Sequence, residues 1–271
     1  MIATPMLRRE VPALVALLCA FPVLEIPAMA QGCTRDVSNN WCGSVGVKAI
    51  VGPTFSGATE TEFIWRPVVE VTWGDRMFLS TQKGAGIWLF RAGLPGDLRA
   101  GVSLGPTFED LDTEEDTRLS GLDPVDEGLD LRLLAEWAWG DAELELVAAE
   151  EVSGDGHGGR SLEFTGGYEF SIRPWLSATV NPYLVWVDDQ YADALYGVSE
   201  EYARNGSLAA YSPRGGLERV GAALGLSIRT SDRVSIVLEW ERSELMNHFA
   251  RSPIVLTDAQ SETTITAIVR Y

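Results

Sequence analysis

The sequence predicts an all-β protein, an antiparallel up-and-down transmembrane β-barrel of about twelve strands. Three observations predict it: apolar residues recur with a period of two, short and long connections alternate along the chain, and an export signal stands at the N-terminus. A barrel of ten strands is the alternative, because the expected strands 76–82 and 86–93 are short and poorly patterned.

The period of two is clearest in residues 129–150, LDLRLLAEWAWGDAELELVAAE. From Leu129 to Trp139 every second residue is apolar, and charged residues occupy several of the positions between. The alternation resumes after the tight turn Gly140-Asp141. This stretch therefore predicts a β-hairpin.

The connections fall into two classes that alternate. Tight turns are expected at 73–76, 94–97, 139–142, 171–174 and 230–233, and polar stretches at 53–61, 109–127, 151–160, 187–216 and 244–261, with a short break at 83–85. Outer-membrane barrels have short periplasmic turns and long external loops. The strands between these connections are expected at 43–52, 62–72, 76–82, 86–93, 98–108, 128–139, 142–150, 161–170, 174–186, 217–229, 233–243 and 262–271.

Aromatic residues next to the turns indicate which solvent the outer face meets. Trp73, Trp137, Trp139 and Phe170 stand where an aromatic girdle would meet the membrane interface. A soluble β-sandwich could show the same alternation of apolar and polar residues. It would not explain the turn asymmetry, the aromatics at strand ends and the export signal together, so a lipid-facing barrel is favoured.

Residues 1–30 are interpreted as a secretory signal peptide. Arg8-Arg9 precede an apolar run over 11–24, and Ala28-Met29-Ala30 matches a cleavage site. The run is shorter than the ~20 residues that a membrane-spanning helix needs. The expected organisation is thus a signal at 1–30, a periplasmic N-terminal arm at 31–42 and an outer-membrane barrel at 43–271.

Cys33 and Cys42 remain after removal of the signal, and such a pair in an exported chain predicts a disulfide. The rival interpretation, a lipidated Cys33, is disfavoured because Ala30-Gln31-Gly32 is a poor match to the required context. The net charge of −18 argues against nucleic acid as a partner.

The end of the chain predicts an assembly signal. Ile265, Ala267, Val269 and Tyr271 share one face with Thr263, and the last residue is aromatic. Such a strand is typical of proteins inserted by the outer-membrane assembly machinery. The alternative is an ordinary strand that ends in Tyr.

Three motifs bring a specific resemblance: Asp188-Asp189-Gln190-Tyr191, Leu195-Tyr196-Gly197-Val198-Ser199 and Ser252-Pro253-Ile254-Val255. They resemble the MipA/OmpV family, the MltA-interacting proteins, over nearly the whole mature chain. The stretch between Arg204 and Tyr211 is one residue longer than the family pattern, and the chain ends in Tyr rather than Phe. The resemblance implies a protein of the Gram-negative outer membrane.

The resemblance leaves more than one function open. The best-known member is a scaffold that links a lytic transglycosylase to a murein synthase, and other relatives are described as porin-like or as adhesins. We expect a non-enzymatic scaffold for murein-synthesising and murein-hydrolysing enzymes, with a narrow porin-like channel or an adhesin as the alternative. The expected partners are outer-membrane lipid and lipopolysaccharide, the assembly machinery and a murein hydrolase or synthase.

A third hypothesis, an outer-leaflet lipid hydrolase, is disfavoured. His157 and His248 both fall in expected loops, where a solvated histidine is the ordinary case. His248 lies near Ser243 and Ser252 in sequence, but no Gly-x-Ser-x-Gly motif is present. We therefore expect no catalytic residues, no cofactor and no metal site.

Residues 109–127 contain nine acidic residues and one Arg. The preferred interpretation is a solvated acidic loop, and the alternative is a site for a divalent cation at Asp110, Asp112 and Glu114. This spacing lacks the glycine and the distal glutamate of an EF-hand loop.

Charged residues on the polar face of the strands are expected in the lumen: Asp130, Arg132, Glu136, Glu143, Glu145, Glu163, Glu169, Arg219, Arg229, Glu239, Glu241 and Arg270. Mixed charges can line a narrow water channel or pair and close it. Acidic residues outnumber the arginines, which predicts weak cation selectivity if the barrel conducts. One hypothesis is that a murein-enzyme partner docks on the arm at 31–41, assisted by Arg76, Arg173 and Arg233 on the turns. The alternative is an arm that only packs against the mouth of the barrel.

Overall fold

A computed structural model describes residues 41–271 except 75, 94, 112, 114–115 and 155. The expected signal peptide, most of the expected arm and Cys33 lie outside the described residues. The Cys33–Cys42 disulfide therefore stays a prediction.

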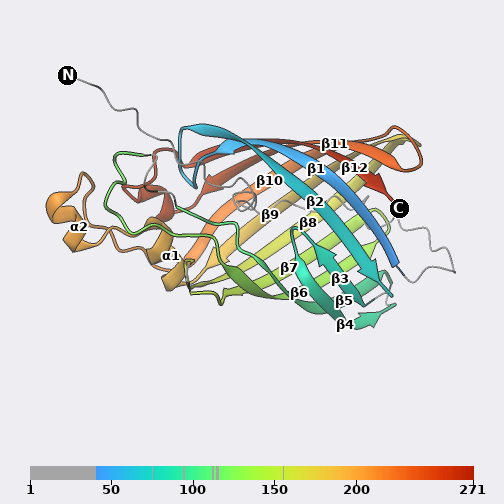
Figure 1. Cartoon of the computed structure of the whole chain (residues 1–271), viewed down its shortest axis with the longest axis horizontal. Coiled ribbons are helices and arrows are strands. Elements are labelled where there is room, and N and C mark those ends of the chain that lie inside the picture. Colours follow the sequence, from blue (N-terminus) through green and yellow to red (C-terminus); the bar gives the residue numbers. More distant parts are fainter. Residues whose placement is uncertain (1–40, 75, 94, 112, 114–115, 155) are drawn as a thin grey trace, which may run out of the picture.

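The described chain forms one closed antiparallel barrel of twelve strands, in the order β1-β12-β11-β10-β9-β8-β7-β6-β5-β4-β3-β2 (Figure 1). The strands are β1 (Trp41–Pro53), β2 (Thr61–Trp73), β3 (Met77–Ser80), β4 (Gly84–Ala92), β5 (Asp97–Pro106), β6 (Leu129–Trp139), β7 (Ala142–Glu151), β8 (Arg160–Arg173), β9 (Leu176–Val187), β10 (Gly216–Arg229), β11 (Val234–Leu245) and β12 (Ala259–Arg270). The predicted fold is confirmed, and each expected strand end lies within three residues of the observed one. The poorly patterned segments are β3 and β4, so the count is twelve.

The outer face of the wall is apolar. Leu133, Leu238 and Ile265 are exposed on β6, β11 and β12, while the alternate residues on the same strands are buried inside. Trp73 and Trp139 are exposed beside their turns. An apolar band with aromatic residues at its border is the surface that a transmembrane barrel presents to lipid.

The two ends of the barrel differ, as the alternation of connections predicts. At the turn side, Gly74 and Gly140 have φ of 57° and 62°, a left-handed conformation that glycine adopts readily and that two-residue hairpins require. The loop side carries the long connections, at the end opposite the C-terminus in Figure 1. By the rule for outer-membrane barrels, the turn side faces the periplasm.

The connection 187–216, expected as a polar loop, contains two short helices. They are α1 (Asp189–Tyr196) and α2 (Glu200–Asn205), with side chains of Asp188 and Ser199 capping their N-termini. A 3₁₀ helix, η2 (Phe249–Arg251), lies in the connection between β11 and β12. Helices this short are unstable alone and form because one face packs on the barrel, which explains why a sequence pattern does not predict them. None of the described helices is long and apolar enough to cross a membrane.

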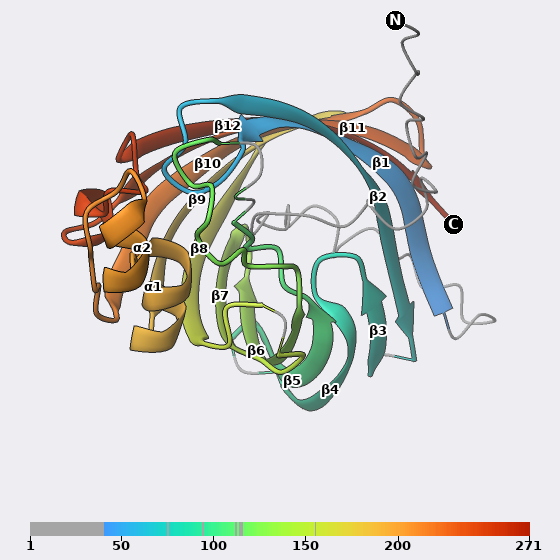
Figure 2. The same cartoon turned by 60° about the vertical axis from the view of Figure 1, so that its left-hand side comes forward.

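The wall is interrupted on the loop side of β3, a short arrow beside the long β2 in Figure 2. All thirteen residues of β2 pair with β1, but only Glu70–Trp73 pair with β3. Beyond Val69, whose backbone bonds to Thr81, the β3-facing side of β2 is an edge within the described chain. Pro67 lies two residues from Val69, so its backbone faces the same side, where its missing N–H breaks no ladder bond.

Candidate functional site in the barrel interior

The interior of the barrel is charged, and it contains the residues expected in the lumen. Asp130, Arg132, Glu136, Arg219 and Glu239 are buried, whereas Glu143, Glu145, Glu163, Glu169, Glu241 and Arg270 are half-buried and Arg229 is exposed at the turn side. Buried charges are tolerated where they pair or accept hydrogen bonds. Their pairing therefore decides whether the lumen is open.

One ion-pair network inside the barrel joins the β3–β4 connection to β5, β6 and β7. The Lys83 ammonium pairs with Glu136 and lies 2.9 Å from Glu145 Oε1, and Arg99 pairs with the same Glu136. Lys83 and Glu136 are both buried. Because Lys83 belongs to the β3–β4 connection and Glu136 and Glu145 to β6 and β7, the network bridges neighbouring strands on one side of the barrel interior. Lys83 was not among the expected lumen residues, since it falls outside the expected strands.

A second network lies nearer the loop side. The Arg219 guanidinium is 3.1 Å from Glu109 Oε1 and 3.7 Å from Glu218 Oε2, and Arg219 and Glu218 are 2 % and 0 % exposed. The pairing with β9 shifts register between Leu217 and Arg219, so a β-bulge turns two consecutive residues inward. A period of two cannot predict both, which is why Glu218 was missed.

Apolar side chains from three connections close the loop side. We call Leu119, Tyr191, Tyr196, Phe249 and Ile254 the loop plug, because each is at most 2 % exposed and all five share one cluster. The Tyr196 hydroxyl donates to Glu218 Oε1 at 2.5 Å, and the Tyr196 and Phe249 rings lie 5.2 Å apart. The plug therefore rests directly on the second ion-pair network.

The motifs that carry the family resemblance build this plug. Tyr191 and Tyr196 belong to α1, and Ile254 lies in the Ser252-Pro253-Ile254-Val255 segment. Ser252 Oγ donates to the Tyr196 carbonyl at 2.7 Å, which joins two of the motifs. The sequence pattern is thus explained by packing on the loop side of the lumen.

The acidic connection 109–127 is not simply a solvated loop. It buries Leu111, Leu119 and Val125 in the same apolar cluster, so that expectation is corrected. Burial, together with the Glu109 and Glu62 carboxylates, raises the pKa of Asp110 to about 6. Among the described residues there is no group of three or more His, Cys, Asp or Glu that could hold a metal ion, and Asp112 and Glu114 lie outside them.

His157 is buried rather than solvated, which corrects the expectation for this residue. It is 6 % exposed, its ring lies 4.5 Å from that of Tyr191, and its Nδ1 accepts from the Gly159 N–H at 3.0 Å. Burial lowers the pKa of the His157 imidazole, so the ring is neutral at pH 7. His157 thus supports the packing of the plug.

His248 does not face a serine nucleophile. Its Nε2 lies 2.5 Å from the Arg214 carbonyl oxygen and must donate to it, while Ser252 Oγ is engaged by the Tyr196 carbonyl. His248 and Ser252 therefore do not form the Ser–His pair that the sequence suggests.

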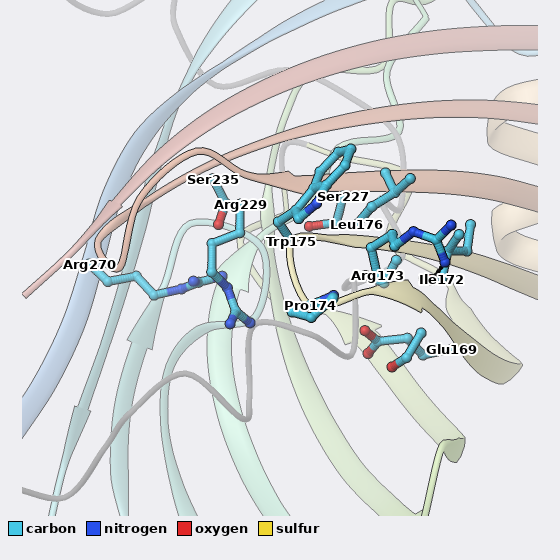
Figure 3. Close-up of a pocket in the computed structure, with 12 residues that line it drawn as sticks. Glu169, Ile172, Arg173, Pro174, Trp175, Leu176, Ser227, Arg229, Ser235 and Arg270 are labelled. Carbon is cyan, nitrogen blue, oxygen red and sulfur yellow. Dashed lines mark hydrogen bonds between the residues drawn. The ribbon is translucent and has the colours of Figure 1, made fainter.

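The turn side of the lumen is hollow. A cavity of about 400 Å³, which we call the turn-side vestibule, lies between the turn-side ends of β8–β12 (Figure 3). Its lining includes Glu169, Arg173, Trp175, Arg229 and Arg270. The expected lumen residues Glu169, Arg229 and Arg270 therefore meet here, away from the networks of the mid-barrel.

Comparison with known proteins places the chain in a family. The family model described as MltA-interacting protein MipA matches residues 45–271. A comparison with curated proteins gives no match.

Solved outer-membrane structures are similar to the chain only distantly. Neisserial surface protein A is 9 % identical, with a TM-score of 0.28 over 86 % of this chain and 98 % of that one. The loop-deleted OmpT of Vibrio cholerae is 8 % identical, with a TM-score of 0.40 over 86 % and 98 %. A bacterial polysaccharide outer-membrane secretin is 9 % identical, with a TM-score of 0.43 over 84 % and 98 %. On the family match and its closed lipid-facing barrel, the chain belongs to the MipA family and is a Gram-negative outer-membrane protein.

Proposed function

We propose that this protein is a non-enzymatic scaffold, a closed barrel that presents its turn side to murein-synthesising and murein-hydrolysing enzymes. The observation that supports this proposal is the filling of the lumen. The loop plug covers the loop side, and the Arg219 and Lys83 networks pair charges beneath it. The family description names a partner of this class, MltA.

The filled lumen favours a scaffold over a channel. A conducting pore needs a continuous water path lined by solvated groups, as in the large porins. Here Glu218, Arg219 and Tyr196 are almost fully buried at one level of the barrel. A solute entering from the turn side would therefore meet paired charges and apolar side chains.

The turn side offers the docking surface. Arg76, Arg173 and Arg233 stand on three different turns and are exposed. A stable interface buries ~800 Å² per partner, which short turns alone do not supply. We therefore include the arm at 31–41, most of which lies outside the described residues, in the proposed surface. Exposed arginines at its rim would attract an acidic partner surface and speed association.

The test is direct binding of purified MltA to the protein in lipid nanodiscs, followed by biolayer interferometry. The variant Arg76→Gln/Arg173→Gln/Arg233→Gln should weaken binding about tenfold, since each rim charge contributes ~0.5 kcal/mol. The matched control Arg204→Gln/Arg214→Gln/Arg251→Gln removes three exposed loop-side arginines and should bind like the wild type. Absence of binding by the wild type, or a loss confined to the loop-side variant, would refute the scaffold proposal.

A further inference from the structure

We infer that the turn-side vestibule binds a carboxylated amino sugar of the kind that murein contains. The binding of an anion is argued from the geometry below, whereas the choice of murein as its source rests on the proposed function.

The vestibule brings two guanidinium groups together. Arg229 at the end of β10 and Arg270 at the end of β12 extend into the same space, since their strands flank β11 (Figure 3). Within the described chain, neither forms an ion pair with a carboxylate, and Glu169 lies on the other side of the cavity. Adjacent like charges repel, so an anion placed between them is favoured, and guanidinium groups match a carboxylate geometrically.

The rest of the lining suits a sugar ring. Four serine hydroxyls, from Ser171, Ser177, Ser227 and Ser235, face the cavity and can donate to or accept from hydroxyl and acetamido groups. Trp175 supplies an aromatic surface, and the Glu169 carboxylate can accept hydrogen bonds from sugar hydroxyls. Charge, hydroxyls and an aromatic face thus occur in one cavity.

The shape of the vestibule favours binding rather than passage. Its volume of about 400 Å³ lies near the lower end of the range for ligand pockets, which limits the inserted part to about one ring. Ser235 and, deeper in the wall, Thr179 are buried. A ring with a carboxylate arm, held by Arg229 and Arg270 while the remaining glycan extends from the turn-side mouth, fits a space of this size.

N-acetylmuramic acid and N-acetylglucosamine form a matched probe pair, because they differ only in the lactyl ether group at O3, which carries the carboxylate. Calorimetric titration of the folded full-length protein in detergent should give at least tenfold tighter binding of N-acetylmuramic acid. The variant Arg229→Gln/Arg270→Gln should lose this discrimination while keeping heat-modifiable mobility, the sign of a folded barrel. The control Arg204→Gln/Arg251→Gln, with the same loss of charge on the loop side, should keep it.

Equal binding of the two sugars, or no binding of either, would overturn the inference. Inorganic phosphate and a free murein stem peptide serve as competitors, and displacement of the sugar at equal concentration by either would show a general anion site and overturn the sugar assignment. If the Arg229→Gln/Arg270→Gln variant loses sugar discrimination but still binds MltA, the vestibule is supported as a site separate from the MltA interface. Sugar binding without any MltA binding would support the vestibule and refute the scaffold.

Discussion

One carboxylate oxygen of Glu127 is buried without a hydrogen-bond partner among the described residues. Burial raises the pKa of this group from its ordinary 4.5 to about 7. Folding is therefore accompanied by uptake of a proton between pH 4.5 and pH 7. As the pH rises through this window, the free energy of unfolding falls. Ionised Glu127 is a local cost of folding the acidic connection at neutral pH.

Glu127→Gln should remove this cost. The variant should equal the wild type below pH 4.5 and gain about 1–2 kcal/mol above pH 7, where the partial exposure of the group limits the effect. Urea unfolding in lipid vesicles at pH 4.5 and pH 8 measures the difference. A gain of the same size at both pH values would contradict the assignment.

Arg132 stabilises the interrupted wall from within. Its guanidinium donates to the carbonyl oxygens of Gln82 and Pro106 and lies 3.2 Å from Asp130 Oδ2. Arg132→Met would leave Asp130 buried without this partner, which is expected to lower stability by about 3–5 kcal/mol. Arg160→Met removes an exposed ion pair with Glu150 and is the control, expected to change little. Comparable urea midpoints for the two variants would disprove the role of Arg132.

At the scale of elements, the part of the β2 edge that pairs with no described strand requires protection from other strands. Pro67 presents no N–H on that edge, a common device against edge-to-edge pairing. Pro67→Val should therefore increase self-association in detergent, measured by analytical ultracentrifugation, whereas Pro124→Val in an exposed connection should not. A monodisperse Pro67→Val sample matching the wild type would show that the proline does not protect the edge.

The elements also show how much of the structure can be predicted from the sequence. Strands were predictable because lipid outside and charge inside impose a strict period of two, as on β6 and β11. The helix α1 and the residue Glu218 were not, since α1 depends on packing and Glu218 on a bulge. The Lys83 network was missed because it joins residues more than fifty positions apart. Pairing between side chains of different strands leaves no pattern in the local sequence.

The vestibule residues illustrate the same division at the turn side. Arg229, Arg270 and Glu169 were predicted to face the lumen from alternation alone. Their convergence on one cavity depends on how the consecutive strands β8 to β12 curve around the lumen, which the alternation along each strand does not specify. The type of a residue and the strand face it occupies follow from the local sequence, whereas a site depends on which strands the folded barrel brings together.

At the scale of the whole molecule, the barrel is closed at one end and hollow at the other. The loop plug is buried at the loop side, and the charge networks lie inside the barrel. This asymmetry separates a scaffold that binds at its turn side from a pore that passes solutes. The proposed closed barrel is the alternative to the channel for which weak cation selectivity is expected, and a conductance measurement decides between the two.

Planar lipid bilayer recording of the wild-type protein tests this claim most directly. Protein confirmed as folded by heat-modifiable mobility should insert without stepwise conductance in 1 M KCl, because the proposed closure by the buried residues Arg219 and Glu218 and the plug would interrupt a water path. Insertion is verified independently by protease protection in vesicles from the same preparation. Reproducible stepwise conductance, of either ion selectivity, would contradict the closed barrel.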